Sequence, residues 1–305
     1  MFVGFDTSNY TTSVAVFDGE KIIQRKKLLT VRHGEKGLRQ SEAVFQHTVN
    51  LPQLISSLNL GEIKVNAVAV SNKPRNVNGS YMPCFLVGEC NAISVAEFSN
   101  APVYKTSHQV GHILAALYSA DKMELINSPF IAFHLSGGTT EALLVTPDKN
   151  EIIKAQVISE SLDLKAGQAI DRTGVMLGLD FPCGKEIDEL SKQSDEKYSF
   201  KPSFKGINCS LSGVENKVKK MIENGENQYD VSKFVLHCIT QTIDKMLKLI
   251  IEKYGNMPVV FSGGVSSNSY LRNYFTERSN VYFAAPEFSC DNAAGVAVYG
   301  YLKSL

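Results

Sequence analysis

Short apolar runs separated by loops of small polar residues recur along this chain, and one group of them is found twice. Residues 2–5 are matched without a gap by residues 130–133, and residues 14–16 are matched in the same register by residues 142–144. The first copy continues into the turn Asp18-Gly19, and Asp-Gly between alternating apolar runs is a strong hairpin signal. We therefore expect two equivalent strand–loop–strand units, each continued by a third strand.

Strand and helix patterns alternate after the first copy. A buried strand is expected over residues 65–70, a helix over about 81–98, a short strand at 102–104 and a helix over about 107–118. Strand–helix–strand alternation indicates a mostly parallel sheet with flanking helices, so the predicted fold class is α/β.

The second copy is followed by a comparable series. A helix is expected over about residues 166–177, and a long amphipathic helix is expected to begin at Asp230, which we interpret as its cap. A strand at residues 258–261 and a last helix from Asp291 to about residue 302 complete the pattern.

Composition limits the class of protein. The 305 residues suffice for two domains, and the formal net charge is zero. No apolar run approaches the ~20 residues that cross a bilayer, so no membrane partner is expected, and the first residues enter a predicted strand without the charged leader of a signal peptide. The six cysteines form no close C-x-x-C pair, which favours reduced thiols and a cytoplasmic protein over a disulfide framework.

Three loops of small residues follow predicted strands. They contain, in chain order, Asp6 with Ser8, Ser136-Gly137-Gly138, and Gly263-Gly264. Paired glycines let backbone N–H groups approach an anion closely. A hairpin loop whose side chains only cap backbone groups explains the first loop equally well. Together and in this order, the loops resemble the nucleotide clamp of the actin, hexokinase and heat-shock chaperone superfamily. That resemblance implies a two-lobed fold with duplicated mixed sheets and an adenine nucleotide held between the lobes.

Two histidines stand one helical turn apart. His108 and His112 lie at positions i and i+4 of a predicted helix, so their imidazoles share one face, as a divalent metal requires. Two histidines on a half-exposed face are the simpler alternative. The zinc-protease pattern is not met because Gln109, rather than Glu, follows the first histidine. Asp291, at the expected start of the last helix, fits either an N-cap or a third metal ligand.

A further group of polar residues lies in the second half of the chain. Asp171, Gly184 and Asp188 fall on a predicted helix and on the Gly- and Pro-marked break that follows it. Carboxylates at such positions can accept hydrogen bonds from ribose hydroxyls. A solvated helix face explains them equally simply.

Several segments taken together resemble the TsaD (Gcp) family, over nearly the whole chain and in order. Members of this family transfer a threonylcarbamoyl group from threonylcarbamoyl-adenylate to an adenine of tRNA. The segments are GFDTSNYTTSVAV, HQVGH, HLSGGTTEALLV, DLKAGQAIDRTGVMLGLDFPCGKEID, NCSLSGVENKV, GGVSSNSYLR and CDNAAGVAVYG.

The resemblance implies a set of site residues. It implies one iron or zinc ion held by His108, His112 and Asp291, which would polarise the carbamoyl-phosphate linkage and neutralise the leaving AMP. It also implies an adenylate site, to which the clamp interpretation adds the third loop. The predicted nucleotide-binding residues are His134, Leu135, Ser136, Gly137, Gly138, Asp171, Gly184, Asp188, Gly263, Gly264 and Asn268.

Four departures from the family pattern lie near the implied site. Val110 replaces an acidic residue between the histidines, Thr139 follows the Gly-Gly pair where the family has His, residues 9–11 lack the usual Cys, Asp and Glu, and residues 72–81 are bulkier and more basic than the usual Gly-rich loop. These departures indicate a divergent member. Three functions stay open: transfer to tRNA adenine, carbamoyl-type transfer to another acceptor, or a non-catalytic nucleotide-binding partner or regulator. A peptidase fits least well.

The partners and lobes follow from the same interpretation. A neutral chain attracts nucleic acid weakly, so we expect weak tRNA binding by this chain alone. The resemblance implies a helper protein, a smaller family relative that forms a heterodimer with this chain. The apolar helix face at residues 113–117 is its expected dock, and ordinary core packing explains that face nearly as well. The expected N-terminal lobe is residues 1–125 plus 291–305, with the metal-binding histidines, and residues 126–290 form the nucleotide-binding lobe.

Overall fold

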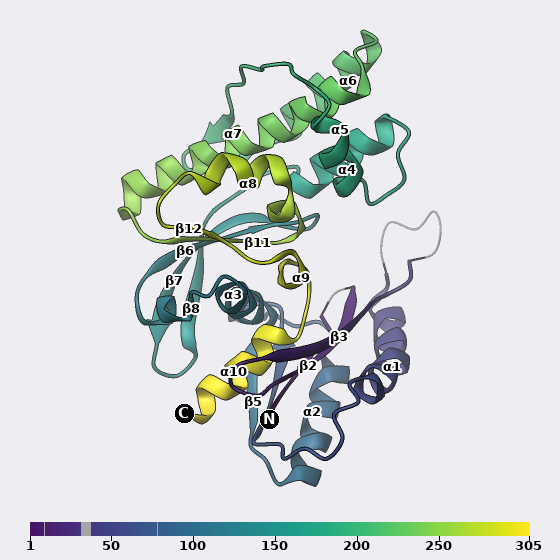
Figure 1. Ribbon diagram of the computed structural model, residues 1–305, viewed down its shortest axis with the longest axis vertical. Helices are drawn as coiled ribbons and strands as arrows, with labels where there is room; N and C mark the ends of the chain where they lie inside the picture. Colours follow the sequence, from purple (N-terminus) through teal and green to yellow (C-terminus); the bar gives the residue numbers. More distant parts are fainter. Residues whose placement is uncertain (9, 32–37, 78) are drawn as a thin grey trace. The chain divides into compact units, whose positions relative to one another are not determined.

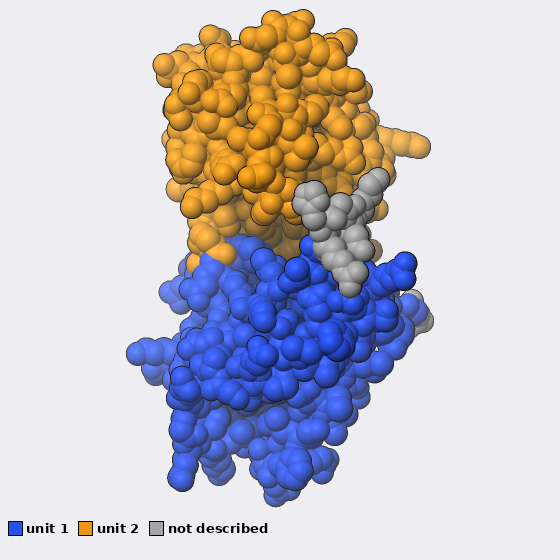
Figure 2. Space-filling model, turned by 90° about the vertical axis from the view of Figure 1, so that its right-hand side faces the viewer, with its two compact units in different colours: residues 1–128, 146–155, 287–305 blue, residues 129–145, 156–286 orange. Residues whose placement is uncertain are grey.

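The computed structural model describes residues 1–8, 10–31, 38–77 and 79–305. Two of the departures noted above include residues, Asn9 and Asn78, that lie outside the described residues. The chain forms two compact units, coloured separately in Figure 2. Unit 1 is Met1–Ser128, Thr146–Ala155 and Glu287–Leu305, and unit 2 is Pro129–Val145 and Gln156–Pro286.

Unit 1 is built on a five-stranded sheet of order β3-β2-β1-β4-β5 (Figure 1). The predicted hairpin is present, because β1 pairs antiparallel with β2, while β4 lies parallel to both β1 and β5. The strands are β1 (Phe2–Asp6), β2 (Thr11–Phe17), β3 (Ile22–Leu28), β4 (Ala67–Lys73) and β5 (Val103–Ser107). The helices of this unit are α1 (Gln40–Ser57), α2 (Phe85–Ser99), α3 (His108–Ser119), the 3-10 helix η1 (Met123–Asn127) and α10 (Ala294–Ser304).

Unit 2 repeats this sheet. Its order, β12-β11-β6-β7-β8, is that of unit 1 with each strand replaced by its equivalent, so the repeat found in the sequence is confirmed. The strands are β6 (Phe130–Leu135), β7 (Thr140–Asp148), β8 (Ile152–Glu160), β11 (Val259–Ser262) and β12 (Val281–Phe283), with a separate hairpin of β9 (Ser203–Lys205) and β10 (Asn208–Ser210). The helices are α4 (Ala166–Met176), α5 (Gly184–Ser191), α6 (Ser212–Glu223), α7 (Gln228–Tyr254), η2 (Gly264–Ser267) and α8 (Ser269–Thr276), and the short α9 (Pro286–Ser289) leads back to unit 1.

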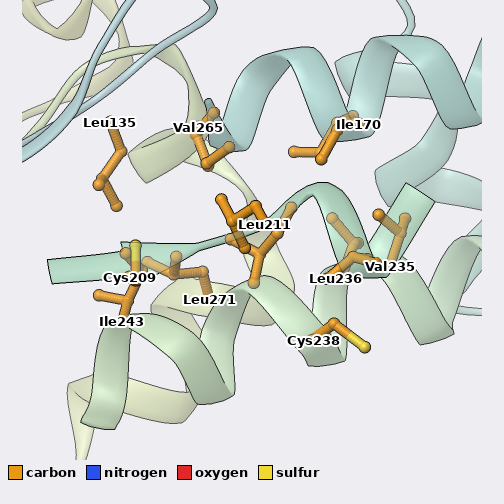
Figure 3. Close-up of a cluster of buried hydrophobic side chains, with 14 of the residues drawn as sticks. Leu135, Ile170, Cys209, Leu211, Val235, Leu236, Cys238, Ile243, Val265 and Leu271 are labelled. Atoms are coloured by element: carbon orange, nitrogen blue, oxygen red, sulfur yellow. The ribbon is translucent and has the colours of Figure 1, made fainter. Parts of the chain in front are cut away.

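The core of unit 2 forms around α7. Its predicted apolar face is buried, as Val235, Cys238 and Ile243 illustrate (Figure 3). Three phenylalanines on adjacent parallel strands stack beneath it, with ring centroids 4.8 Å apart for Phe133 and Phe261 and 4.9 Å apart for Phe261 and Phe283. Burial of these side chains at about 1.5–3 kcal/mol each is what holds the helix on the sheet.

A pair of glycines lets α10 pack closely on α3 (Figure 1). A Cβ atom on Gly295 would overlap the carbonyl oxygen of Gly111 and lie 2.5 Å from the backbone nitrogen of Ala115. The backbones of the two helices therefore touch at this point. This contact fixes the last segment of the chain against the helix that begins with His108.

Three sequence-based expectations are wrong in detail. Helix α7 is capped by Asn227, whose side-chain oxygen accepts from the Asp230 backbone N–H at 2.9 Å, so Asp230 lies inside the first turn. Helix α10 begins at Ala294, and Asp291 precedes it in a loop instead of capping it. Residues 113–117 are between 0 and 3% exposed, packed inside unit 1, and cannot be the expected dock.

In the part of the chain that the structure describes, no helix combines the length and apolarity needed to cross a bilayer.

Candidate functional site

The ends of three neighbouring strands build one corner of unit 1. Strands β1, β4 and β5 are parallel, so their carboxyl ends meet at one edge of the sheet. Strand β1 ends at Asp6, and β5 ends at Ser107, directly before His108 opens α3. The Ser107 side chain caps α3 by accepting from the Val110 backbone N–H at 3.3 Å. This cap fixes the start of α3 and therefore the position of His108.

The predicted metal ligands converge at this corner. The rings of His108 and His112 are 4.3 Å apart, centroid to centroid, at 79° to each other. Both present Nε2 to the same carboxylate oxygen: Asp291 Oδ1 lies 3.0 Å from Nε2 of His112 and 3.4 Å from Nε2 of His108. One ligand atom from each of the three residues lies within 4.8 Å of the others.

These residues fit a transition-metal ion. Two imidazole nitrogens and one carboxylate oxygen are ligands that both zinc and iron accept, and three protein ligands leave a coordination position for a substrate. The side chains are 17% exposed for His108, 7% for His112 and 24% for Asp291, so the cluster is sheltered but keeps part of its surface accessible.

Groups of opposite charge lie side by side at this corner. Burial raises the pKa of Asp6, but His108 beside it more than offsets this and holds that pKa below its ordinary value. Asp291 follows the same pattern, since burial is outweighed by the two histidines and its pKa lies well below the usual range. Burial lowers the pKa of His108, whereas Asp6 and Asp291 raise it to about 10. The metal-free cluster is therefore an ion pair, and metal binding would displace a proton from it.

The two predicted glycine loops lie next to each other in unit 2. Strands β6 and β11 are parallel neighbours, with Ser262 opposite His134, so the loops that follow them share one sheet edge. Gly263 has φ +91°, and a Cβ atom there would lie 2.7 Å from the Leu135 carbonyl carbon, so only glycine fits. Around Gly138 and Gly264 a Cβ atom would meet nothing within 4 Å, which leaves the open space that a ligand needs.

The other predicted nucleotide residues lie around this edge, and several of them have protein partners. Asp188 accepts from the Ser269 backbone N–H at 3.0 Å and from its hydroxyl at 2.8 Å. Asp171 accepts from the Cys183 backbone N–H at 2.9 Å, and burial raises its pKa. Gly184 is the first residue of α5, and Asn268 is the N-cap of α8. The remaining predicted residues lie on β6 and on the loop that follows it: His134, Leu135, Ser136 and Gly137.

Comparison with known proteins decides the family. A family model for TsaD, described as tRNA N6-adenosine threonylcarbamoyltransferase, matches residues 22–298. The chain belongs to the TsaD family. A tRNA N6-adenosine threonylcarbamoyltransferase from Thermosipho africanus is 30% identical, covering 98% of this chain and 93% of that protein. One from Riemerella anatipestifer is 28% identical, covering 99% of this chain and 92% of that protein.

Solved structures confirm the fold of this TsaD-family chain. The activator of 2-hydroxyisocaproyl-CoA dehydratase from Clostridium difficile, solved with bound ADPNP, matches with a TM-score of 0.56 and 16% identity over 100% of this chain and 96% of that one. A ROK family glucokinase from Streptomyces griseus, in complex with glucose and AMPPNP, matches with a TM-score of 0.53 and 11% identity over 99% of this chain and 98% of that one. The predicted actin/hexokinase/heat-shock-chaperone class of fold is therefore confirmed.

One departure from the TsaD pattern lies away from the ligand cluster. Val110, at the acidic position of the family motif, is 1% exposed and belongs to the buried side of α3. Loop residues beyond β4 lie closer, since the Pro74 carbonyl accepts from the backbone N–H of Gln109, the residue after His108, at 3.1 Å. The basic segment 73–75 is thereby attached to the first turn of α3.

Several basic side chains of this chain make contacts within the protein. Lys26 donates to the Glu287 carbonyl at 2.8 Å, and Arg25 donates to the Ser57 carbonyl at 3.2 Å. On α6, Lys217 lies 4.9 Å from the ring centroid of Phe200, and Lys219 lies 3.9 Å from a Glu223 carboxylate oxygen.

Proposed function

We propose that this chain transfers a threonylcarbamoyl group from threonylcarbamoyl-adenylate to an adenine of tRNA, with one iron or zinc ion held by His108, His112 and Asp291. Transfer of this group to tRNA is the activity of the family to which the chain belongs. The observation that carries the proposal for this member is the convergence of both Nε2 atoms on Asp291 Oδ1. Three sheltered metal ligands that converge in this way favour a metal-dependent transferase over a protein that only binds a nucleotide.

The residues of the proposed centre have separate tasks. The two imidazoles and the Asp291 carboxylate hold the ion, which when bound supplies a Lewis acid for the acyl-phosphate end of the donor. Helix α3 keeps both imidazoles on one face, and the Gly111–Gly295 contact keeps the Asp291 segment against that helix. We assign this centre to the predicted N-terminal lobe, residues 1–125 plus 291–305, of a cytoplasmic protein.

We assign nucleotide binding to the glycine loops within residues 126–290. The open space at Gly138 and Gly264 supports this, as do the nucleotide analogues in structural relatives. Replacing Gly264 by Val is expected to weaken ATP binding at least about tenfold, because its side chain fills that space. Calorimetry with ATP measures the change. Gly213→Val is the matched control, since Gly213 lies on α6 and also has nothing within 4 Å. Equal affinities of both variants would remove these loops from the nucleotide site.

We propose tRNA as the acceptor, bound weakly unless a partner protein is present. A chain of zero net charge has little overall attraction for tRNA, so its affinity should be low. The affinity that it has should come from Lys and Arg contacts to phosphates and should therefore fall steeply between 50 and 200 mM salt, in the range of about 10³-fold where six or more phosphates are contacted. Fluorescence titration with tRNA at two salt concentrations measures this, with and without a co-purified smaller family relative. Tight binding by the chain alone that does not change with salt would contradict the expectation.

The direct test is a reconstituted reaction. Metal-loaded protein is mixed with preformed threonylcarbamoyl-adenylate and tRNA, with and without the partner, and the digested tRNA is analysed by mass spectrometry. The expected result is threonylcarbamoyladenosine from the wild type and none from His112→Ala. AMP release without modified tRNA would show that the acceptor is wrong, and neither product would show a nucleotide-binding protein without transferase activity.

A further inference from the structure

We propose that Asp6 is a positioning residue that orients His108, so that Nε2 of this histidine faces the metal. This inference rests on the proposed metal centre and extends it to a residue that none of the implied ligand sets includes. Asp6 is the last residue of β1 and is 1% exposed. A buried carboxylate is costly unless it is fully hydrogen-bonded, so its partners indicate its role.

Both oxygens of Asp6 have protein donors. Oδ2 lies 2.7 Å from Nδ1 of His108. Oδ1 accepts from the Ser8 backbone N–H at 2.9 Å and from the Ser71 hydroxyl at 2.8 Å. With its oxygens directed at these groups, Asp6 is placed to hold His108 and is not placed to ligate the ion itself.

The contact selects one tautomer of His108. An ionised carboxylate only accepts, so Nδ1 must carry the hydrogen that bridges to Asp6, and in the neutral ring the lone pair is then on Nε2. Nε2 is the atom that lies 3.4 Å from Asp291 Oδ1. The Ser8 hydroxyl, 2.7 Å from the same Nδ1, shares this hydrogen. A carboxylate on the distal nitrogen also raises the basicity of the ligand and fixes its ring.

The fold supplies this arrangement through three elements. Asp6 comes from β1, Ser71 from β4 and His108 from the start of α3 after β5, and β4 lies between β1 and β5. Pairing of the three strands therefore sets the direction of the imidazole. A shift in strand pairing would move Asp6 away from His108.

Asp6→Asn tests the inference. The amide keeps the size of the side chain but loses its negative charge. Its NH2 group must then face one of the groups that donate hydrogen bonds to the Asp6 carboxylate in the wild type. Zinc affinity, measured by chelator competition, is expected to fall about 10- to 100-fold. The matched control is Thr12→Ala, which removes a hydroxyl 2.8 Å from Nδ1 of another buried histidine, His47, in the same unit. Zinc affinity of that variant should equal that of the wild type.

Two outcomes would overturn the inference. One is a folded Asp6→Asn protein, by circular dichroism, that binds zinc as tightly as the wild type. The other needs no variant: in zinc-loaded wild type labelled with ¹⁵N-histidine, NMR should show His108 with a hydrogen on Nδ1, and a ring bound to zinc through Nδ1 would refute the role of Asp6. Unchanged zinc affinity in His108→Ala would instead refute the metal centre, so the two failures are distinguishable.

Discussion

Replacing His112 by Ala is expected to remove metal binding almost completely. The imidazole supplies one of three ligands, and the two that remain bind a zinc or iron ion at least about 100-fold more weakly, since loss of an outer-shell partner alone costs 10- to 100-fold. His112 is also the ligand closest to Asp291 Oδ1, at 3.0 Å, so its loss leaves that carboxylate facing His108 only across 3.4 Å. Elemental analysis of protein purified without chelators should show near-stoichiometric metal in the wild type and less than about a tenth of it in the variant.

The control for this experiment lies in unit 2. His237 on α7 is half-buried, and its Nδ1 lies 3.1 Å from the Tyr270 hydroxyl. His237→Ala removes another partly sheltered imidazole without touching the cluster, so its metal content should equal that of the wild type. Full metal content in His112→Ala would mean that the ion, if present, is bound elsewhere.

Replacing Gly295 by Ala is expected to cause the largest loss of stability. The added Cβ overlaps backbone atoms of α3, which cannot rotate away as a side chain would, so α10 and α3 must separate. We expect a cost of at least about 3 kcal/mol, or roughly 6–12 °C in melting temperature for a domain of this size. Because Asp291 lies just before α10, the variant should also lose metal. Thermal unfolding by circular dichroism, with elemental analysis, measures both effects.

Two other glycine-to-alanine changes calibrate this result. At Gly300, on the same helix, the Cβ would lie 3.1 Å from the side-chain carbon of Ala69, a contact that a small shift relieves, so the change should stay within about 1 kcal/mol. At Gly213 on α6 nothing lies within 4 Å, and Ala should be neutral or stabilising. A Gly295→Ala protein as stable as these two would show that the helices are not in close contact.

The sheets could be predicted from the sequence because their signals are local. The hairpin of β1 and β2 follows from alternation and an Asp-Gly turn, and its repeat at β6 and β7 follows from matching residues. The amphipathic face of α7 predicted its buried side chains. The histidine pair was equally local, since the spacing of His108 and His112 alone places both imidazoles on one face of α3.

Other features depend on contacts between distant parts of the chain. Asp6 and His108 are 102 positions apart, and no periodicity in the sequence indicates that β1, which ends at Asp6, and β5, which precedes His108, both pair with β4 in one sheet. The apolar residues 113–117 could not be assigned to a dock or to a core until α10 was seen to cover them, although a helix apolar on nearly every side favours burial. Asn227 and Asp230 are both good caps, and only the backbone at Asn227, which is extended, decides between them.

The most direct test of the account is whether this chain makes threonylcarbamoyladenosine in a cell that lacks its own transferase. The wild-type gene and His112→Ala are expressed to equal levels, and the modified nucleoside is measured by mass spectrometry of total tRNA. We predict that the wild type restores the modification and that His112→Ala does not. A well-expressed wild type that leaves the tRNA unmodified, with its partner present, would contradict the proposed reaction.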